Sequence, residues 1–214
     1  MMNNRYPGYD VLRKRQGPSW NDPSRQVVDH RLAVPRENGA FSTTQRRTLE
    51  ALCDRIVPQP TDRPPIPVAA LVQFKVAEGR GDGYRDARLP PLQQAWPLGL
   101  DALDSEAQQR HGRGFAELAA AEQNALIAAM QRDELKSDAW QGVPAAAFFS
   151  HRVVHDISAA YYSHPTAWNE LGFGGPASPR GYVRLAEDSR DSWEAAEAHP
   201  GEEAKARKLN RHVR

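Results

Sequence analysis

Two histidines, His151 and His155, are four residues apart in the sequence HRVVHD and are the first candidates for chemistry. On an α-helix this spacing points both rings to the same side, as in the paired zinc ligands of H-E-x-x-H helices. The glutamate that serves as general base in those helices is absent, and no third ligand is evident. A metal site on this pair remains an alternative, and a structural or interface role is favoured.

The second candidate is the stretch YYSHPTAWNELGFGGPASPRGY, residues 161–182, which is dense in glycine, proline and aromatic residues. Its GFGGP segment lacks the G-x-G-x-x-G spacing, follows no expected strand and is followed by no P-loop lysine, so a phosphate-binding role is unfavourable. The chain has no G-x-S-x-G motif to mark a nucleophilic serine. The sequence therefore predicts a binding or structural protein, with no catalytic residue and no cofactor site of its own.

The composition narrows the class of protein further. The 214 residues carry a net charge of +1, which gives no electrostatic footprint for nucleic acid. The mean hydropathy is −0.70. The sequence contains no run of 18 apolar residues, so no membrane-spanning helix is expected. Cys53 is the only cysteine and is expected to be a small buried hydrophobe. With no signal peptide recognised at the start, a cytoplasmic chain is expected; a periplasmic one is the alternative if a partner carries the export signal.

Hydrophobic periodicity predicts an all-α fold of four to six helices joined by proline-rich loops. Ser42 and Gln45 form a capping box before the first confident helix. The expected helices cover residues 42–56, 68–78, 92–111, 119–135 and 144–162. Residues 1–40 are read as an extended N-terminal arm, residues 41–185 as a helical domain, and residues 186–214 as a charged C-terminal tail.

The expected helix 144–162 has apolar or aromatic residues on two sides. At 100° per residue, Phe149, Val153 and Ile157 share one side, whereas Phe148 and the histidine pair share the other. A helix of this kind is usually buried on both sides, so a second helix or a second protein is expected to cover the other face.

Several motifs together resemble the gluconate 2-dehydrogenase subunit 3 family. They are LEALCDRIVP, the Phe148-Phe149 pair, and the segment from Trp168 through GFGGP to Arg180-Gly181-Tyr182. The resemblance covers roughly residues 41–185. It implies a non-catalytic accessory subunit bound to a large GMC-type flavoprotein that oxidises sugars, sugar acids or glycosides. The FAD would belong to that partner, and a cytochrome c subunit accompanies some such complexes.

If the chain binds such a partner, its aromatic and arginine side chains should dominate the interface energy. The residues expected to contact the partner are Tyr9, Trp20, Phe148, Tyr162, Trp168, Phe173, Arg180 and Tyr182. Two alternatives remain open: a free-standing helical scaffold or chaperone, and a metal-binding protein that uses His151 and His155.

Overall fold

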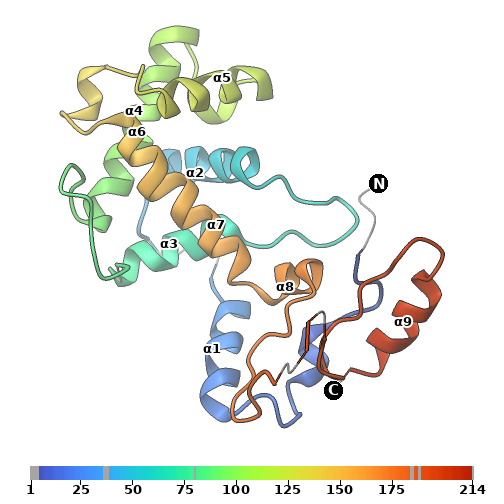
Figure 1. Ribbon diagram of the computed structural model, residues 1–214. Helices are drawn as coiled ribbons and strands as arrows, with labels where there is room; N and C mark the ends of the chain where they lie inside the picture. The colour runs from blue at the N-terminus through green and yellow to red at the C-terminus, as the bar shows by residue number, and fades with distance from the viewer. Residues whose placement is uncertain (1–4, 36–38, 80, 184–185, 188, 214) are drawn as a thin grey trace. The chain divides into compact units, whose positions relative to one another are not determined.

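The computed structural model describes residues 5–35, 39–79, 81–183, 186–187 and 189–213. The chain divides into two compact units (Figure 1). One unit, Val34–Tyr161, is called here the helical unit. The other combines Met1–Ala33 with Tyr162–Arg214 and is called the terminal unit.

The fold is all-α, as predicted. Within the described residues there is no strand, and the only bridge of β type is an isolated one between Trp20 and Ser178. The predicted helices between residues 42 and 162 are all present, and the described residues add α1, α8 and α9. The expected total of four to six helices is therefore exceeded. None of the described helices is long and apolar enough to cross a membrane.

In the helical unit, α2 spans Thr43–Ile56, α3 Val68–Glu78, α4 Leu92–His111 and α5 Ala120–Gln131. The predicted capping box is present, because Gln45 N donates to Ser42 Oγ (3.2 Å) and Ser42 N donates to Gln45 Oε1 (3.0 Å). Cys53 is buried, as expected. Burial also raises the pKa of its thiol well above its ordinary range.

A long continuous helix completes this unit and is drawn in Figure 1 as one rod. It consists of α6 (Ala145–Phe148), a π-helical segment (Phe149–Val154) and α7 (His155–Tyr162). Phe148 and Val153 are both fully buried. The π-helical segment between them departs from the 100° per residue on which the predicted two-sided pattern rests.

Phe148 is completely buried in the core of the helical unit. Its ring packs edge-on against Trp96 (centroids 5.4 Å apart) and Trp140 (6.0 Å). A Cβ added at Gly99 of α4 would collide with the Phe148 ring, so this glycine makes room for the aromatic side chain. The core of this unit therefore depends on a glycine and a phenylalanine that are distant in sequence.

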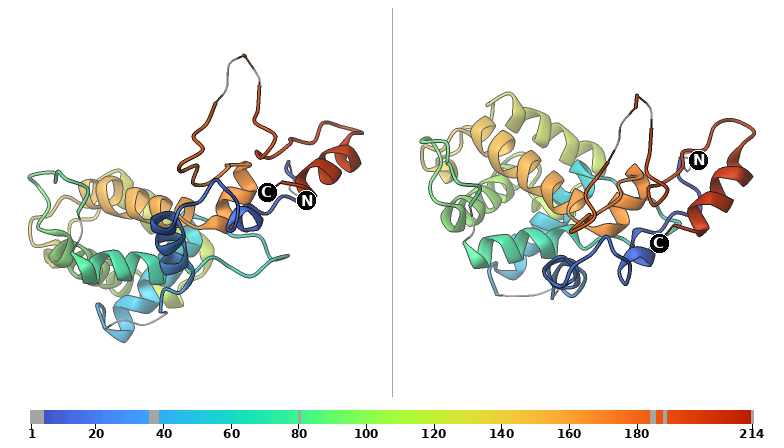
Figure 2. Two further views of the ribbon diagram at one scale, coloured as in Figure 1. Left: turned by 90° about the horizontal axis from the view of Figure 1, so that it is seen from below. Right: turned by 60° about the horizontal axis from the view of Figure 1, so that its bottom comes forward.

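The terminal unit joins the two ends of the chain. It contains a short 3₁₀ turn (Val11–Lys14), α1 (Asp22–Leu32), α8 (Pro165–Leu171) and α9 (Glu203–Arg211). Figure 2 shows the N-terminal segments, in blue, beside the orange and red C-terminal ones. Its core is formed by Tyr9, Val11, Trp20, Val28, Trp168, Ala195 and Val213.

These contacts group the chain differently from the predicted division at residues 40 and 185. The N-terminal arm is not free, because Val11 N donates to Asn169 Oδ1 (2.8 Å) and Ala198 N donates to Arg5 O (2.7 Å). The charged tail contributes buried residues to the same core. The predicted boundary at residue 185 lies outside the described residues.

Candidate functional site

The predicted histidine pair is best examined through Asp156, which follows His155 on α7. The Asp156 side chain is fully buried. It accepts hydrogen bonds from Lys75 Nζ (2.9 Å), from Trp96 Nε1 (2.8 Å) and from Arg152 (3.3 Å). Burial alone would raise the pKa of Asp156, but hydrogen bonds from His155, Lys75 and Trp96 outweigh it and lower that pKa. Asp156 is therefore an ionised carboxylate that ties α3 and α4 to α7.

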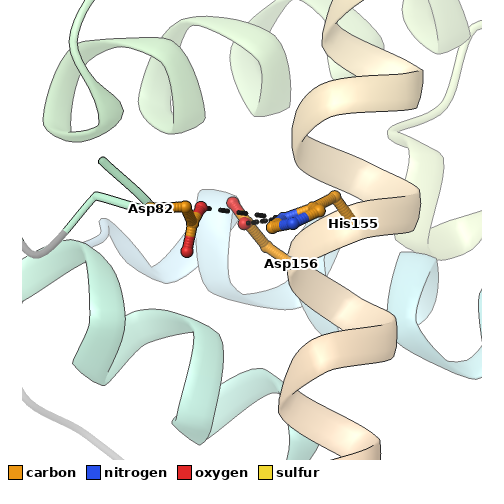
Figure 3. Close-up of side chains that lie close together, drawn as sticks. All are labelled: Asp82, His155 and Asp156. Atoms are coloured by element: carbon orange, nitrogen blue, oxygen red, sulfur yellow. Dashed lines mark hydrogen bonds and ion pairs between the residues drawn. The ribbon is translucent and has the colours of Figure 1, made fainter. Parts of the chain in front are cut away.

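Asp82, His155 and Asp156 form the group that comes nearest to a metal site in the described part of the chain. Each offers a ligand atom within 4.8 Å of the others. Figure 3 shows their side chains converging, Asp82 from the loop after α3 and the other two from the long helix. Lys75 Nζ, however, is 2.8 Å from Asp82 Oδ1 and 2.9 Å from Asp156 Oδ1. The lysine ammonium already supplies the positive charge between these carboxylates, so a divalent ion would have to displace it.

His151 is separate from this group. Its Nε2 lies 3.1 Å from Asp86 Oδ2, whereas His155 Nδ1 lies 3.0 Å from Asp156 Oδ1. Hydrogen bonds from Arg88 hold the pKa of Asp86 well below its ordinary range. The two histidines thus face different carboxylates, His151 that of Asp86 and His155 that of Asp156.

The terminal unit carries a continuous line of four aromatic rings, which we call the aromatic row. Trp168 of α8 meets Phe173 edge-on (centroids 5.6 Å apart). Phe173 stacks on Tyr182 (6.4 Å), and Tyr182 contacts Trp193 (4.8 Å). Phe173 and Tyr182 are the two predicted site residues that this row brings together with Trp168.

The loop that carries the row is held at several points. Trp168 Nε1 donates to Tyr162 O (2.7 Å), and the Tyr182 hydroxyl donates to Gly175 O (2.6 Å). Gly172, with a φ of 67°, adopts the left-handed conformation that ends α8. These contacts fix the backbone on both sides of Phe173.

The glycines of GFGGP pack against side chains of the chain itself. A Cβ at Gly172 would meet the Tyr6 ring, and one at Gly174 would meet the Tyr182 hydroxyl at 2.7 Å and Trp193 at 3.0 Å. A phosphate-binding loop leaves this space for the ligand. The space beside these glycines is therefore filled by side chains of the chain itself.

Lys14 anchors the loop from the N-terminal side. Its side chain is buried, its Nζ donates to Gly174 O, and its ammonium lies 4.3 Å from the centroid of the Trp193 ring. Arg180 lies on the same ring, with its Cζ 5.3 Å from the centroid. Burial and, to a lesser degree, the charge of Arg180 lower the pKa of Lys14 to about 8, against the opposing effect of Glu194.

Exposed apolar residues belong to the row or lie within two residues of it in the sequence, and we call them the apolar edge. Its members are Leu171, Phe173, Tyr182 and Val183, which are 52%, 46%, 39% and 60% exposed. Tyr162 is a further exposed aromatic residue of this unit. Apolar side chains exposed together on a folded surface are typical of protein–protein contacts.

The other predicted contact residues lie elsewhere. Tyr9, Trp20 and Trp168 are buried in the terminal unit and Phe148 in the helical unit, whereas Arg180 is half-buried against Trp193. Burial accounts for the first four as core residues. Of the predicted set, Tyr162, Phe173 and Tyr182 are the aromatic residues that remain available to a partner.

The sequence of the chain was compared with models of known protein families. One family model, described as gluconate 2-dehydrogenase subunit 3, matches residues 43–175, which is more than half of the chain. The chain belongs to the gluconate 2-dehydrogenase subunit 3 family. No curated protein matches it, and no solved structure does.

Membership of the subunit 3 family confirms the resemblance inferred from the sequence. The family description makes the chain an accessory subunit of a dehydrogenase. The matched residues include the Asp156 network and the row as far as Phe173. The rest of the row and the N- and C-terminal segments that support it lie outside the match.

Three residues of the terminal unit are not predicted from the sequence: Lys14, which lies on the Trp193 ring, Trp193 itself, and the buried Asn210. Lys14 lies in the basic segment RKRQ, where nothing separates it from its exposed neighbours. Trp193 and Asn210 lie in a segment read as a charged tail. A tryptophan in such a segment was the one signal that this tail packs against something.

Proposed function

We propose that this chain is the non-catalytic small subunit that binds and stabilises an FAD-dependent, GMC-type dehydrogenase acting on sugars, sugar acids or glycosides. The single observation that carries the proposal is the apolar edge on a fixed loop, in a chain whose family is named for a dehydrogenase subunit. The large catalytic subunit would cover this edge.

The chemistry of the edge supports this reading. Interface cores are enriched in Phe, Tyr and Trp because each ring buries a large area and loses little side-chain entropy. Phe173 and Tyr182 are already ordered by stacking on each other and by the hydrogen bond from Tyr182 to Gly175. A partner that binds them therefore loses less free energy to ordering than it would with a flexible loop.

The titratable groups of the helical unit support a role without chemistry of its own. Asp156 is held by Lys75, Arg152 and Trp96, and Asp86 is held by Arg88 and His151. Both carboxylates are held by ion pairs and hydrogen bonds within the helical unit. In this proposal the flavin and the substrate site lie in the partner.

The test is co-expression with the catalytic dehydrogenase subunit, followed by size-exclusion chromatography and assays of its flavin content and activity. We expect a stable complex and a catalytic subunit that loses activity on warming faster when this chain is left out. A chain that elutes alone, with no effect on the half-life of the dehydrogenase, would overturn the proposal.

A further inference from the structure

A second feature of the terminal unit is a surface pocket between residues 190–192 and α9. Its volume is about 390 Å³. The residues that line it are Arg190, Ser192, Lys205, Lys208, Leu209 and His212. We call it the basic pocket, because four of these side chains are cationic or can become so.

The helix α9 has two distinct faces. Ala206 and Asn210, with Val213 just beyond the helix end, are buried in the terminal unit. Lys205, Lys208, Leu209 and His212 recur at i, i+3, i+4 and i+7, which places them on one other face. The helix therefore docks on its own chain with one side and presents a basic side to the pocket.

Two of the basic side chains of the pocket are not paired with a carboxylate in the described residues. Lys208 and His212 have no carboxylate partner in the described part of the chain, and Lys205 has only an exposed contact with Glu202 (3.2 Å). Arg190 donates to the carbonyl of Glu194 (2.9 Å). The helix dipole favours cations in the last turn of α9, but it does not explain Lys205 near the first turn or Arg190 on another segment.

We propose that the basic pocket binds an acidic segment of the catalytic subunit, with an apolar side chain of that segment resting on Leu209. This inference rests on the proposed function and names the chemistry of the partner. Leu209 is 44% exposed in the middle of the cationic side chains, so it offers an apolar contact surrounded by positive charge. A peptide with carboxylates on both sides of one apolar residue complements that arrangement.

Two features favour a protein segment over a small molecule. The cationic side chains stand in solvent (the Lys205 side chain is 69% exposed), whereas small-molecule sites rely on buried, preorganised polar groups. The pocket also adjoins the aromatic row, because Ser192 immediately precedes Trp193 in the chain. One partner surface can therefore contact the apolar edge and the pocket together.

The experiment compares two charge reversals on the same helix. Lys205→Glu/Lys208→Glu changes the pocket face, and Arg207→Glu/Arg211→Glu makes the same change of charge on exposed positions outside the pocket. The dissociation constant of each variant for the catalytic subunit is measured at low and at high salt, with circular dichroism to check folding. We expect the pocket variant to bind at least about tenfold more weakly at low salt and to lose most of the salt dependence.

The matched variant Arg207→Glu/Arg211→Glu should stay within about threefold of the wild type. Equal weakening by both variants, or none by the pocket variant, would overturn this inference and leave the proposed function standing. No complex with the wild-type chain would overturn both. Saturable binding of inorganic phosphate to the isolated chain, lost in the pocket variant, would assign the pocket to a small anion and also overturn the inference.

Discussion

The side-chain amide of Asn210 donates a hydrogen bond to the carbonyl of Pro7, 203 residues away, over 3.1 Å. The same amide donates to Ala196 O (3.0 Å), and its oxygen accepts from Ala196 N (2.7 Å). Asn210 is fully buried. One side chain thus joins α9, the segment before it and the start of the chain.

Asn210→Ala should loosen the terminal unit and leave the helical unit intact. It would leave buried backbone groups of Pro7 and Ala196 without partners, at a cost of about 1–3 kcal/mol. Hydrogen exchange followed by mass spectrometry should show faster exchange in residues 5–15 and 193–213. The exposed Asn124→Ala of α5 is the control and should leave all rates unchanged. Equal protection in both variants would contradict this account of Asn210.

Lys14→Met tests the buried ammonium through the pH dependence of stability. Because the pKa of Lys14 is lowered to about 8, the folded chain binds fewer protons there than the unfolded chain between pH 8 and the ordinary lysine value. The contribution of Lys14 to the free energy of unfolding therefore rises with pH, by at most about 1.4 kcal/mol per pH unit.

The comparison of interest for Lys14 is the difference in melting temperature between wild type and Lys14→Met. We expect the melting temperature of the wild type, relative to that of Lys14→Met, to increase as the pH rises from 7 to 9.5. Raised pKa values of Cys53 and Tyr9 act on both proteins alike and cancel in the difference. A difference that does not change with pH would show that Lys14 titrates normally.

Asp156→Asn removes the negative charge that Lys75 and Arg152 share. Loss of one member of a buried ion pair costs about 3–5 kcal/mol, since the buried Arg152 guanidinium loses its carboxylate; Lys75 keeps Asp82 as a partner. Asp82→Asn is the matched control, because its carboxylate is partly exposed and should contribute about 1 kcal/mol or less. Urea denaturation measures both, and similar losses would contradict the central role of Asp156.

The lowered pKa of Asp156 adds an acid-side prediction. Its contribution to stability is present above the ordinary aspartate pKa and is lost as the pH falls through the lower folded value. The wild type should therefore lose more stability than Asp156→Asn when the pH falls from 5 to 2.

Gly99→Ala should destabilise the helical unit, because the new methyl group would enter the space of the Phe148 ring. Overpacking of this kind costs about 1–3 kcal/mol. Adding Phe148→Leu should restore part of that loss, and thermal denaturation of the single and double variants measures the coupling. Strictly additive effects would contradict the close packing of these two residues.

Features that depend on contacts between residues close in the sequence could be predicted, whereas features that depend on contacts between distant residues could not. The capping box of Ser42 and Gln45 is local, and it correctly places the start of α2. The π-helical segment that follows Phe148 departs from a constant 100° per residue, which the sequence pattern does not anticipate. Lys14 contacts Gly174, which is 160 residues away in the sequence, and Asn210 contacts Pro7, which is 203 residues away. Neither contact can be predicted from the local sequence.

For the candidate surface, the sequence identified the segment but not which of its residues are exposed. Trp168 and Phe173 are both aromatic and five residues apart, yet one is 6% and the other 46% exposed. That difference arises because Trp168 packs into a core completed by residues 9–28 and 195–213. Local sequence carries no information on such a distant core.

If the apolar edge binds the catalytic dehydrogenase subunit, Phe173→Ser should weaken that binding. Tyr84→Ser is the control, because Tyr84 is 78% exposed and belongs to the helical unit, which does not contain the edge. Isothermal titration calorimetry with the purified catalytic subunit gives the dissociation constants, after circular dichroism has shown that both variants fold. The account predicts that Phe173→Ser weakens binding at least about tenfold while Tyr84→Ser binds like the wild type. Equal affinities of the two variants would contradict it.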